Sequence, residues 1–231
     1  MGADVIPVDP VNIFDPAPFG PFSYYAHIGI GVIGLLAAIL ALSTKKGSPV
    51  HIWSGRTFMV CVVLVAITAL ILLATRMAPP LMVAACASVY AIATAWLALK
   101  PGSDKVRRAE YGWSIFLLAV MAVFTSMAIP TVLAGQIPAI GPLVICIIPL
   151  VLLAGDANFF VKPDQREALR IRRHLARMIW AFVISVRAPL AEFYAELDIP
   201  VAFILFGPLI VAPMMIWFFL WKQNSVLSRN P

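Results

Sequence analysis

Charged side chains are scarce in this chain, and their scarcity excludes a soluble globular domain. Of the 231 residues, 12% are charged and 62% hydrophobic, and the mean hydropathy is +0.95. Soluble domains carry roughly a quarter charged residues. The sequence also has no HExxH motif, no nucleophile beside a base, no paired carboxylates and no metal-ligand cluster. We therefore predict no catalytic residues and no metal site, and favour a protein that is not an enzyme.

Cysteine is also rare, and the three cysteines exclude a disulfide framework. They are odd in number, lie inside apolar runs and have no ligand-like spacing: Cys61, Cys86 and Cys146. The glycines of Gly29-Ile30-Gly31-Val32-Ile33-Gly34 match a dinucleotide-binding fingerprint. That fingerprint needs a preceding strand, whereas this run lies within an apolar segment, so we interpret its glycines as packing positions.

Long hydrophobic runs dominate what is present. Seven of them have about the 20 residues that cross a bilayer as a helix. They cover residues 23–43, 53–74, 79–100, 111–133, 137–160, 174–193 and 199–221. The pattern predicts an all-α, polytopic membrane helix bundle with seven transmembrane helices.

Basic residues alternate between the connections, and this predicts the orientation. Fifteen of the 17 lysines and arginines fall in every second connection or in the C-terminal tail, and only Arg76 and Arg187 fall on the other side. Cytoplasmic loops retain such residues, so we expect the N-terminus outside and the C-terminus in the cytoplasm of a bacterial cytoplasmic (inner) membrane. The domains are an external acidic, proline-rich arm (1–22), the transmembrane domain (23–221) and a cytoplasmic tail (222–231). The net charge of +6 then suits anionic lipid headgroups as partners, and we exclude nucleic acid.

Stripes of small residues predict which helices lie inside the bundle. The third span has one at Ala84, Ser88, Ala91, Ala95 and Ala98, and the first has one at Gly31, Gly34, Ala38 and Ala41. Small residues let helices approach closely in lipid, so both helices are expected inside. The later spans contain prolines that are expected to kink them: Pro130, Pro142, Pro149, Pro189, Pro208 and Pro213.

Two of the three histidines are candidate cofactor ligands. His51 and His174 both lie near the predicted cytoplasmic boundary, whereas His27 is near the opposite surface. Axial ligation of b-type haem requires histidines that face each other from different helices. The alternative, which we favour, is that they are interfacial hydrogen-bonding groups, and a third alternative is a substrate or proton site.

A polar cap is expected where three helix ends meet on the cytoplasmic side. Its candidate residues are His51, Arg56, Asp156, Arg173 and His174. Such a cap could hold an anionic headgroup, a quinone or a metabolite, or it could be a structural salt-bridge network, which we favour. The basic residues Arg166, Arg170, Arg173 and Arg177 recur at helical spacing and predict a basic ridge. This ridge could bind anionic lipid, although the preference for basic residues inside the cell also explains it.

Three polar residues are candidates for sites within the membrane: His27, Arg187 and Glu192. Arg187 lies within a predicted span, with Glu192 or Glu196 as its expected partner. Alternatively, its side chain extends to the outer interface.

Several of these motifs resemble one family. Lys46-Gly47, His51, Gly55-Arg56, Phe58-Met59, Gly155-Asp156 and Arg173-His174-Leu175-Ala176-Arg177-Met178 are similar to bacterial predicted membrane proteins of the domain-of-unknown-function 2306 type. The resemblance spans roughly residues 23–195. It implies a multi-helix membrane protein and lends weight to His51, Arg56, Asp156 and His174, without supplying a reaction.

Three functions follow from these patterns. The first is an accessory or scaffold subunit that associates with other membrane proteins or with itself. The second is a redox module that holds haem or quinone at the polar cap. The third is a small transporter or channel, suggested by the prolines and Arg187. We favour the first, which leaves any cofactor unassigned.

Overall fold

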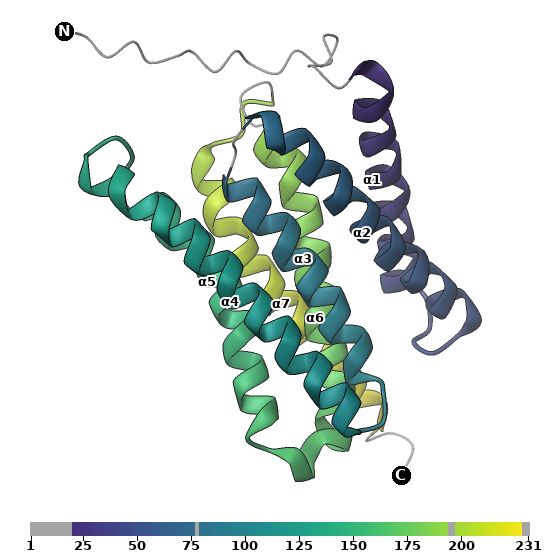
Figure 1. Ribbon diagram of the computed structural model, residues 1–231. Coiled ribbons are helices and arrows are strands. Elements are labelled where there is room, and N and C mark those ends of the chain that lie inside the picture. The colour runs from purple at the N-terminus through teal and green to yellow at the C-terminus, as the bar shows by residue number, and fades with distance from the viewer. Residues whose placement is uncertain (1–19, 77–78, 194–196, 228–231) are drawn as a thin grey trace, which may run out of the picture.

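The computed structural model describes residues 20–76, 79–193 and 197–227, and these residues form helices and no strands (Figure 1). The helices are α1 (Gly20–Ser43), α2 (Pro49–Arg76), α3 (Pro79–Ala98), α4 (Asp104–Leu133), α5 (Ile140–Phe160), the short 3-10 helix η1 (Pro163–Gln165), α6 (Arg166–Glu192) and α7 (Val201–Leu227). The predicted all-α bundle is confirmed. Within these described residues, six helices are long and apolar enough to cross a membrane, and α6 is not among them. The predicted external arm (1–22) lies almost wholly outside the described residues.

α3 and α6 form the centre of the bundle. Together they carry much of the main buried core, including Tyr90, Ala91 and Ala95 from α3 and Ile179 and Ala181 from α6. Four of the five positions in the predicted stripe on α3 are buried, and Ala84 is partly buried. Their small side chains let the two helices approach closely. The expectation that α3 lies inside the bundle is therefore confirmed.

α1 lies at the edge of the bundle and packs mainly on α2 (Figure 1), so the expectation that it lies inside is wrong. Two of its small residues, Gly31 and Gly34, face this neighbour. A Cβ atom added to Gly34 would lie 2.8 Å from the Cβ atom of Cys61. The other faces of α1 carry large exposed side chains such as Val32, Leu36 and Ile39. The small-residue stripe on α1 thus marks a helix pair, not a central position.

Several helices begin earlier than the apolar runs predicted. α2 begins at Pro49, and α4 and α6 begin with charged first turns, because charged residues at a helix end can remain helical outside the apolar layer. In α4 the Ser103 side chain accepts a hydrogen bond from the Val106 N–H group at 3.3 Å, and Asp104 follows in the first turn. Both features favour a helix N-terminus. At the other end of the chain, α7 continues to Leu227, past the predicted start of the tail.

Proline affects four helices. Pro130, Pro149, Pro189, Pro208 and Pro213 lie inside α4, α5, α6 and α7. Pro142, however, lies in the first turn of α5, where its missing N–H group breaks no helical hydrogen bond. Pro142 therefore gives α5 no reason to kink, contrary to the expectation.

Candidate functional site

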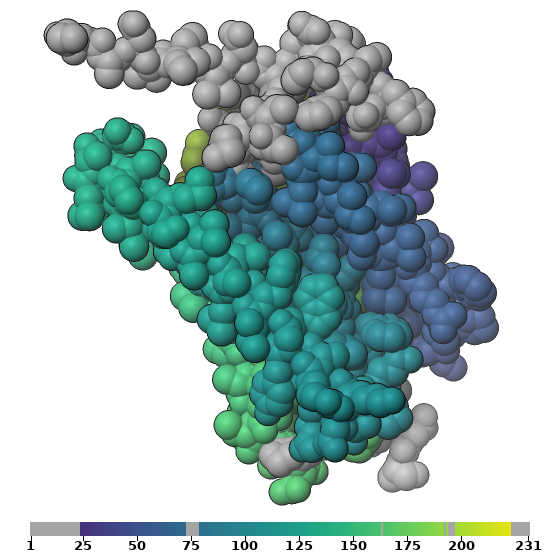
Figure 2. Space-filling view, in the orientation of Figure 1, coloured from purple at the N-terminus to yellow at the C-terminus, as the bar shows by residue number. Residues whose placement is uncertain are grey.

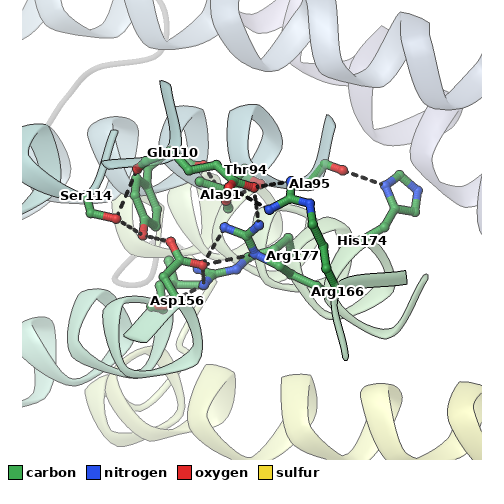
Figure 3. Close-up of polar contacts among 12 residues, drawn as sticks. Ala91, Thr94, Ala95, Glu110, Ser114, Asp156, Arg166, His174 and Arg177 are labelled. Atoms are coloured by element: carbon green, nitrogen blue, oxygen red, sulfur yellow. Dashed lines mark hydrogen bonds and ion pairs between the residues drawn. The ribbon is translucent and has the colours of Figure 1, made fainter. Parts of the chain in front are cut away.

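The connections 44–48, 99–103 and 161–165 lie at the same end of the bundle, which we call the basic end. Near this end, α4, α5 and α6 bring charged side chains together inside the protein. We call this group the arginine–carboxylate cluster (Figure 3). It consists of Glu110, Asp156, Arg166, Arg173 and Arg177.

Helix geometry explains how these residues meet. Arg173 and Arg177 lie seven and eleven residues after Arg166, so all three project from one face of α6. Glu110 lies near the beginning of α4, and Asp156 lies one turn before the end of α5. The exposed fraction is 0% for Glu110 and 1% for Asp156. Carboxylates are rarely buried in this way without charged partners.

Glu110 binds two arginines. Arg166 donates to it in a bidentate manner, with Nη1 2.9 Å from Oε2 and Nη2 3.0 Å from Oε1. Arg173 adds a third hydrogen bond, from Nη1 to Oε1 at 2.6 Å. Bidentate, charge-assisted bonds of this type are among the strongest in proteins. Glu110 is thus saturated by guanidinium groups from α6.

Asp156 is bound from three sides. Arg173 donates from Nε and Nη2 to Oδ1, at 3.1 and 2.8 Å. Arg177 also donates to Oδ1, and the hydroxyl group of Tyr90 donates to Oδ2. These contacts connect α3, α5 and α6. Arg173 therefore bridges the two carboxylates and joins both halves of the cluster.

Aromatic rings complete the surroundings of the arginines. The guanidinium carbons of Arg173 and Arg166 lie 4.1 and 4.9 Å from the centre of the Phe159 ring. The Arg177 guanidinium lies 5.4 Å from the centre of the Tyr90 ring. Cation–π contacts of this kind are stronger when the cation is removed from water.

The cluster has an excess of positive groups. It holds three guanidinium and two carboxylate groups, and within the described part of the chain Arg177 Nη1 and Arg166 Nε have no hydrogen-bond partner. Arginine does not give up its proton at physiological pH, and both carboxylates are engaged by several donors. The arrangement is therefore suited to holding helices together.

The structure assembles only part of the predicted polar cap. Asp156 and Arg173 join directly, as expected for a salt-bridge network. His174 and His51 instead bind backbone carbonyls, and Arg56 is exposed with its guanidinium 5.7 Å from the centre of the Trp53 ring. The expected grouping of five is thus reduced to one pair, which belongs to a larger cluster.

The predicted basic ridge on α6 is wrong. Arg166, Arg173 and Arg177 point into the protein toward the two carboxylates, and only Arg170 of the four is exposed. Arg170 pairs with Glu167 on the same helix, Nε to Oε2, at 3.1 Å. The physical reason is that Glu110 and Asp156 are buried and require positive partners. Three of the four arginines therefore cannot reach lipid headgroups.

His51 and His174 have the same hydrogen-bonding arrangement. His174 Nδ1 lies 3.1 Å from the Ala95 carbonyl oxygen, and His51 Nδ1 lies 3.0 Å from the Ala41 carbonyl oxygen. A carbonyl only accepts, so each Nδ1 carries a proton, and in the neutral form of either ring Nε2 is an acceptor. His27 lies apart from them, with Nδ1 2.7 Å from Thr68 Oγ1 between α1 and α2.

Arg187 bonds to the backbone of the neighbouring helix. Its Nε donates to the Ile204 carbonyl in α7 at 2.9 Å. The side chain of Glu192, one of its expected partners, lies outside the described residues, as does Glu196. Arg187 thus contacts α7 and is partly buried.

Two members of the network, Glu110 and Tyr90, were not singled out from the sequence at all, and Arg166 and Arg177 were expected only in the basic ridge. Glu110 and Tyr90 are completely buried, and Tyr90 also lies 3.5 Å from Ser114, oxygen to oxygen. One signal could have found Glu110: three inward-facing arginines at helical spacing require acidic partners, and few acidic residues lie near apolar runs. Tyr90 has no comparable signal, since a tyrosine in an apolar run is common.

Comparison with known proteins adds no relative. The chain matches no family model, no curated protein and no solved structure.

Proposed function

We propose that the protein is a seven-span membrane protein of the bacterial cytoplasmic membrane, with its basic end in the cytoplasm, that serves as an accessory or scaffold subunit. The six apolar helices support the membrane location. In this proposal α6 is the seventh membrane-spanning helix. Its arginines Arg173 and Arg177 are paired inside the bundle and do not face lipid. The resemblance to proteins of the domain-of-unknown-function 2306 type remains part of the proposal.

The observation that carries the scaffold role is the saturation of both buried carboxylates by arginine. The cluster links α4 and α5 through α6, and Tyr90 adds α3. Breaking such a pair is costly because it leaves an uncompensated buried charge. The four helices are therefore linked by buried ion pairs and hydrogen bonds, and the outer faces of the bundle carry large apolar side chains, available to lipid, to other subunits or to a second copy.

Co-purification tests this role. The chain is tagged at its native expression level and isolated in mild detergent, and the mass of the complex is measured. We expect a stoichiometric assembly, which the Glu110→Gln variant loses and the matched surface variant Asp104→Asn keeps. A wild-type protein that is isolated only as a single chain would overturn the scaffold role.

A second candidate function is a haem- or quinone-binding redox module. It is favoured by His51 and His174, whose Nδ1–H groups are held by backbone carbonyls while Nε2 remains available. Ligating histidines are commonly oriented by such a bond from the other ring nitrogen. Two histidines on different helices could supply the axial ligands of one b-type haem.

An absorption spectrum of the purified protein distinguishes the haem alternative. A Soret band that disappears in His51→Ala and His174→Ala, and persists in the control His27→Ala, would support it. A colourless wild-type protein purified from haem-supplemented cells would reject it, and organic extraction of the same sample would reveal bound quinone.

A further inference from the structure

An open apolar groove lies where α2, α3 and α4 meet. It has a volume of about 500 Å³ and is lined by residues that include Val63, Leu70, Cys86, Val89, Gly112 and Phe116. These three helices form the face of the molecule shown in Figure 2. The groove is open to the surroundings, and in a membrane protein these surroundings include lipid chains.

The helix faces that line the groove carry cations toward the basic end. Arg56 precedes Val63 by seven residues on α2, and Arg108 precedes Gly112 by four on α4. Residues at these spacings share one helix face. Both arginines are exposed. On two of its three sides, the apolar groove therefore continues into a positively charged rim.

The connection that follows α3 contributes the third cation of this rim. Trp96 follows Val89 by seven residues, and the ammonium group of Lys100 lies 4.2 Å from the centre of the Trp96 ring. Lys100 is partly exposed, and Trp96 is 49% exposed. An amphipathic tryptophan beside a lysine is typical of the membrane–water interface. We call Arg56, Lys100 and Arg108 the basic rim.

We propose that this groove and the basic rim form a binding site for one anionic phospholipid, with an acyl chain in the groove and the phosphate at the rim. Charge complementarity selects this occupant: the apolar lining suits a hydrocarbon chain, and three cations at one end suit a negative headgroup. The sequence suggested that arginines of α6 bind lipid headgroups, but three of them are paired with Glu110 and Asp156. The basic rim is therefore the proposed headgroup contact instead. The inference rests on the proposed membrane location and not on the scaffold role.

Gly112 provides a direct way to block the site. A Cβ atom added there meets no atom within 4 Å, and Gly112 lines the groove, so the side chain of Gly112→Leu would occupy space that an acyl chain needs. Gly141, near the start of α5 and outside the groove, has the same freedom and supplies the control Gly141→Leu. For the rim, Arg56→Gln and Arg108→Gln are compared with Arg172→Gln, an exposed arginine of α6.

Native mass spectrometry of the full chain in mild detergent measures the binding of phosphatidylglycerol and of phosphatidylcholine with identical acyl chains. We expect one phosphatidylglycerol per chain and weaker binding of phosphatidylcholine. Gly112→Leu should abolish this binding, each rim substitution should weaken it about fivefold, and both controls should leave it unchanged.

Three results would overturn the proposal. Equal binding of the two lipids would remove the role of the rim, and an equal loss in Arg172→Gln would show only general surface attraction. If Gly112→Leu changed the oligomeric state but not lipid binding, the groove would bind a second copy. Lipid binding is measured on the single purified chain, so it succeeds or fails independently of the co-purification of partners.

Discussion

Arg187 in α6 donates its Nε–H to the carbonyl of Ile204 in α7, at a distance of 2.9 Å. Ile204 precedes Pro208 by four residues, so its carbonyl would normally accept the hydrogen bond that proline cannot donate. The arginine thus satisfies the acceptor that the proline leaves without a helical partner. In an apolar layer no water can donate a hydrogen bond to this carbonyl. The need for a donor therefore explains why Arg187 lies here, far from the basic end.

Replacing Arg187 by methionine should therefore destabilise the contact between α6 and α7. We expect a loss of about 1 kcal/mol in the free energy of unfolding, the usual scale for a polar contact between membrane helices. In the Pro208→Ala background, α7 supplies its own N–H group to Ile204, so the same substitution should cost less. Unfolding titrations of the four proteins measure both values. Equal costs in the two backgrounds would show that Arg187 acts elsewhere.

The arginine–carboxylate cluster should be sensitive to the loss of one charge. Glu110→Gln leaves Arg166 and Arg173 without their shared carboxylate, and breaking a buried pair in this way costs about 3–5 kcal/mol. Thermal unfolding in detergent measures the effect. The matched control is Asp104→Asn, which removes the exposed partner of Arg107 in the same helix. Exposed pairs contribute little because water screens them, so a similar loss in both variants would contradict the burial of the cluster.

Gly34 should tolerate no side chain. A Cβ atom at this position would lie 2.8 Å from the Cβ atom of Cys61, which is fixed to the α2 backbone, so Gly34→Ala must push α1 away from α2. Overpacking of this kind costs about 1–3 kcal/mol. Gly29→Ala in the same helix meets no atom within 4 Å and is the control. Thermal unfolding of both variants, with cross-linking between α1 and α2, provides the measurement. Equal stability of the two would show that the helices are farther apart.

The crossing of α6 can be tested by labelling single cysteines in a chain whose native cysteines are replaced by alanine. Gln136, Lys162 and Leu197 are exposed positions before α5, before α6 and before α7. With seven crossings, a membrane-impermeant reagent outside the cell should label Gln136→Cys and Leu197→Cys but not Lys162→Cys. If α6 lay on the membrane surface, positions 162 and 197 would share one side and react alike.

Much of the fold could be predicted because apolar run length and helix periodicity are local properties of the chain. The small residues of α3 identified a central helix correctly, since Ala91 and Ala95 are buried. The same reasoning failed for α1. A stripe of small residues indicates a close neighbour but does not say how many neighbours surround the helix, which depends on segments distant in the sequence.

The site was less predictable for a related reason. Arginine spacing on α6 correctly placed Arg166, Arg173 and Arg177 on one face. It could not say whether that face meets lipid headgroups or acidic side chains. The answer depends on Glu110, which lies 63 positions from Arg173 in the sequence, and the charge of Glu110 suggested a position outside the predicted span. Pairing between distant helices is settled only when they pack.

The cluster also constrains how the protein is made. In the seven-span arrangement that we propose, α6 is a poor candidate for unaided membrane insertion, since each arginine at a helix centre costs about 2.5–3.5 kcal/mol. Glu110 and Asp156 precede Arg166, Arg173 and Arg177 in the chain. Both acidic partners are therefore synthesised before the arginines that pair with them. α6 can then insert beside α4 and α5, which already present Glu110 and Asp156.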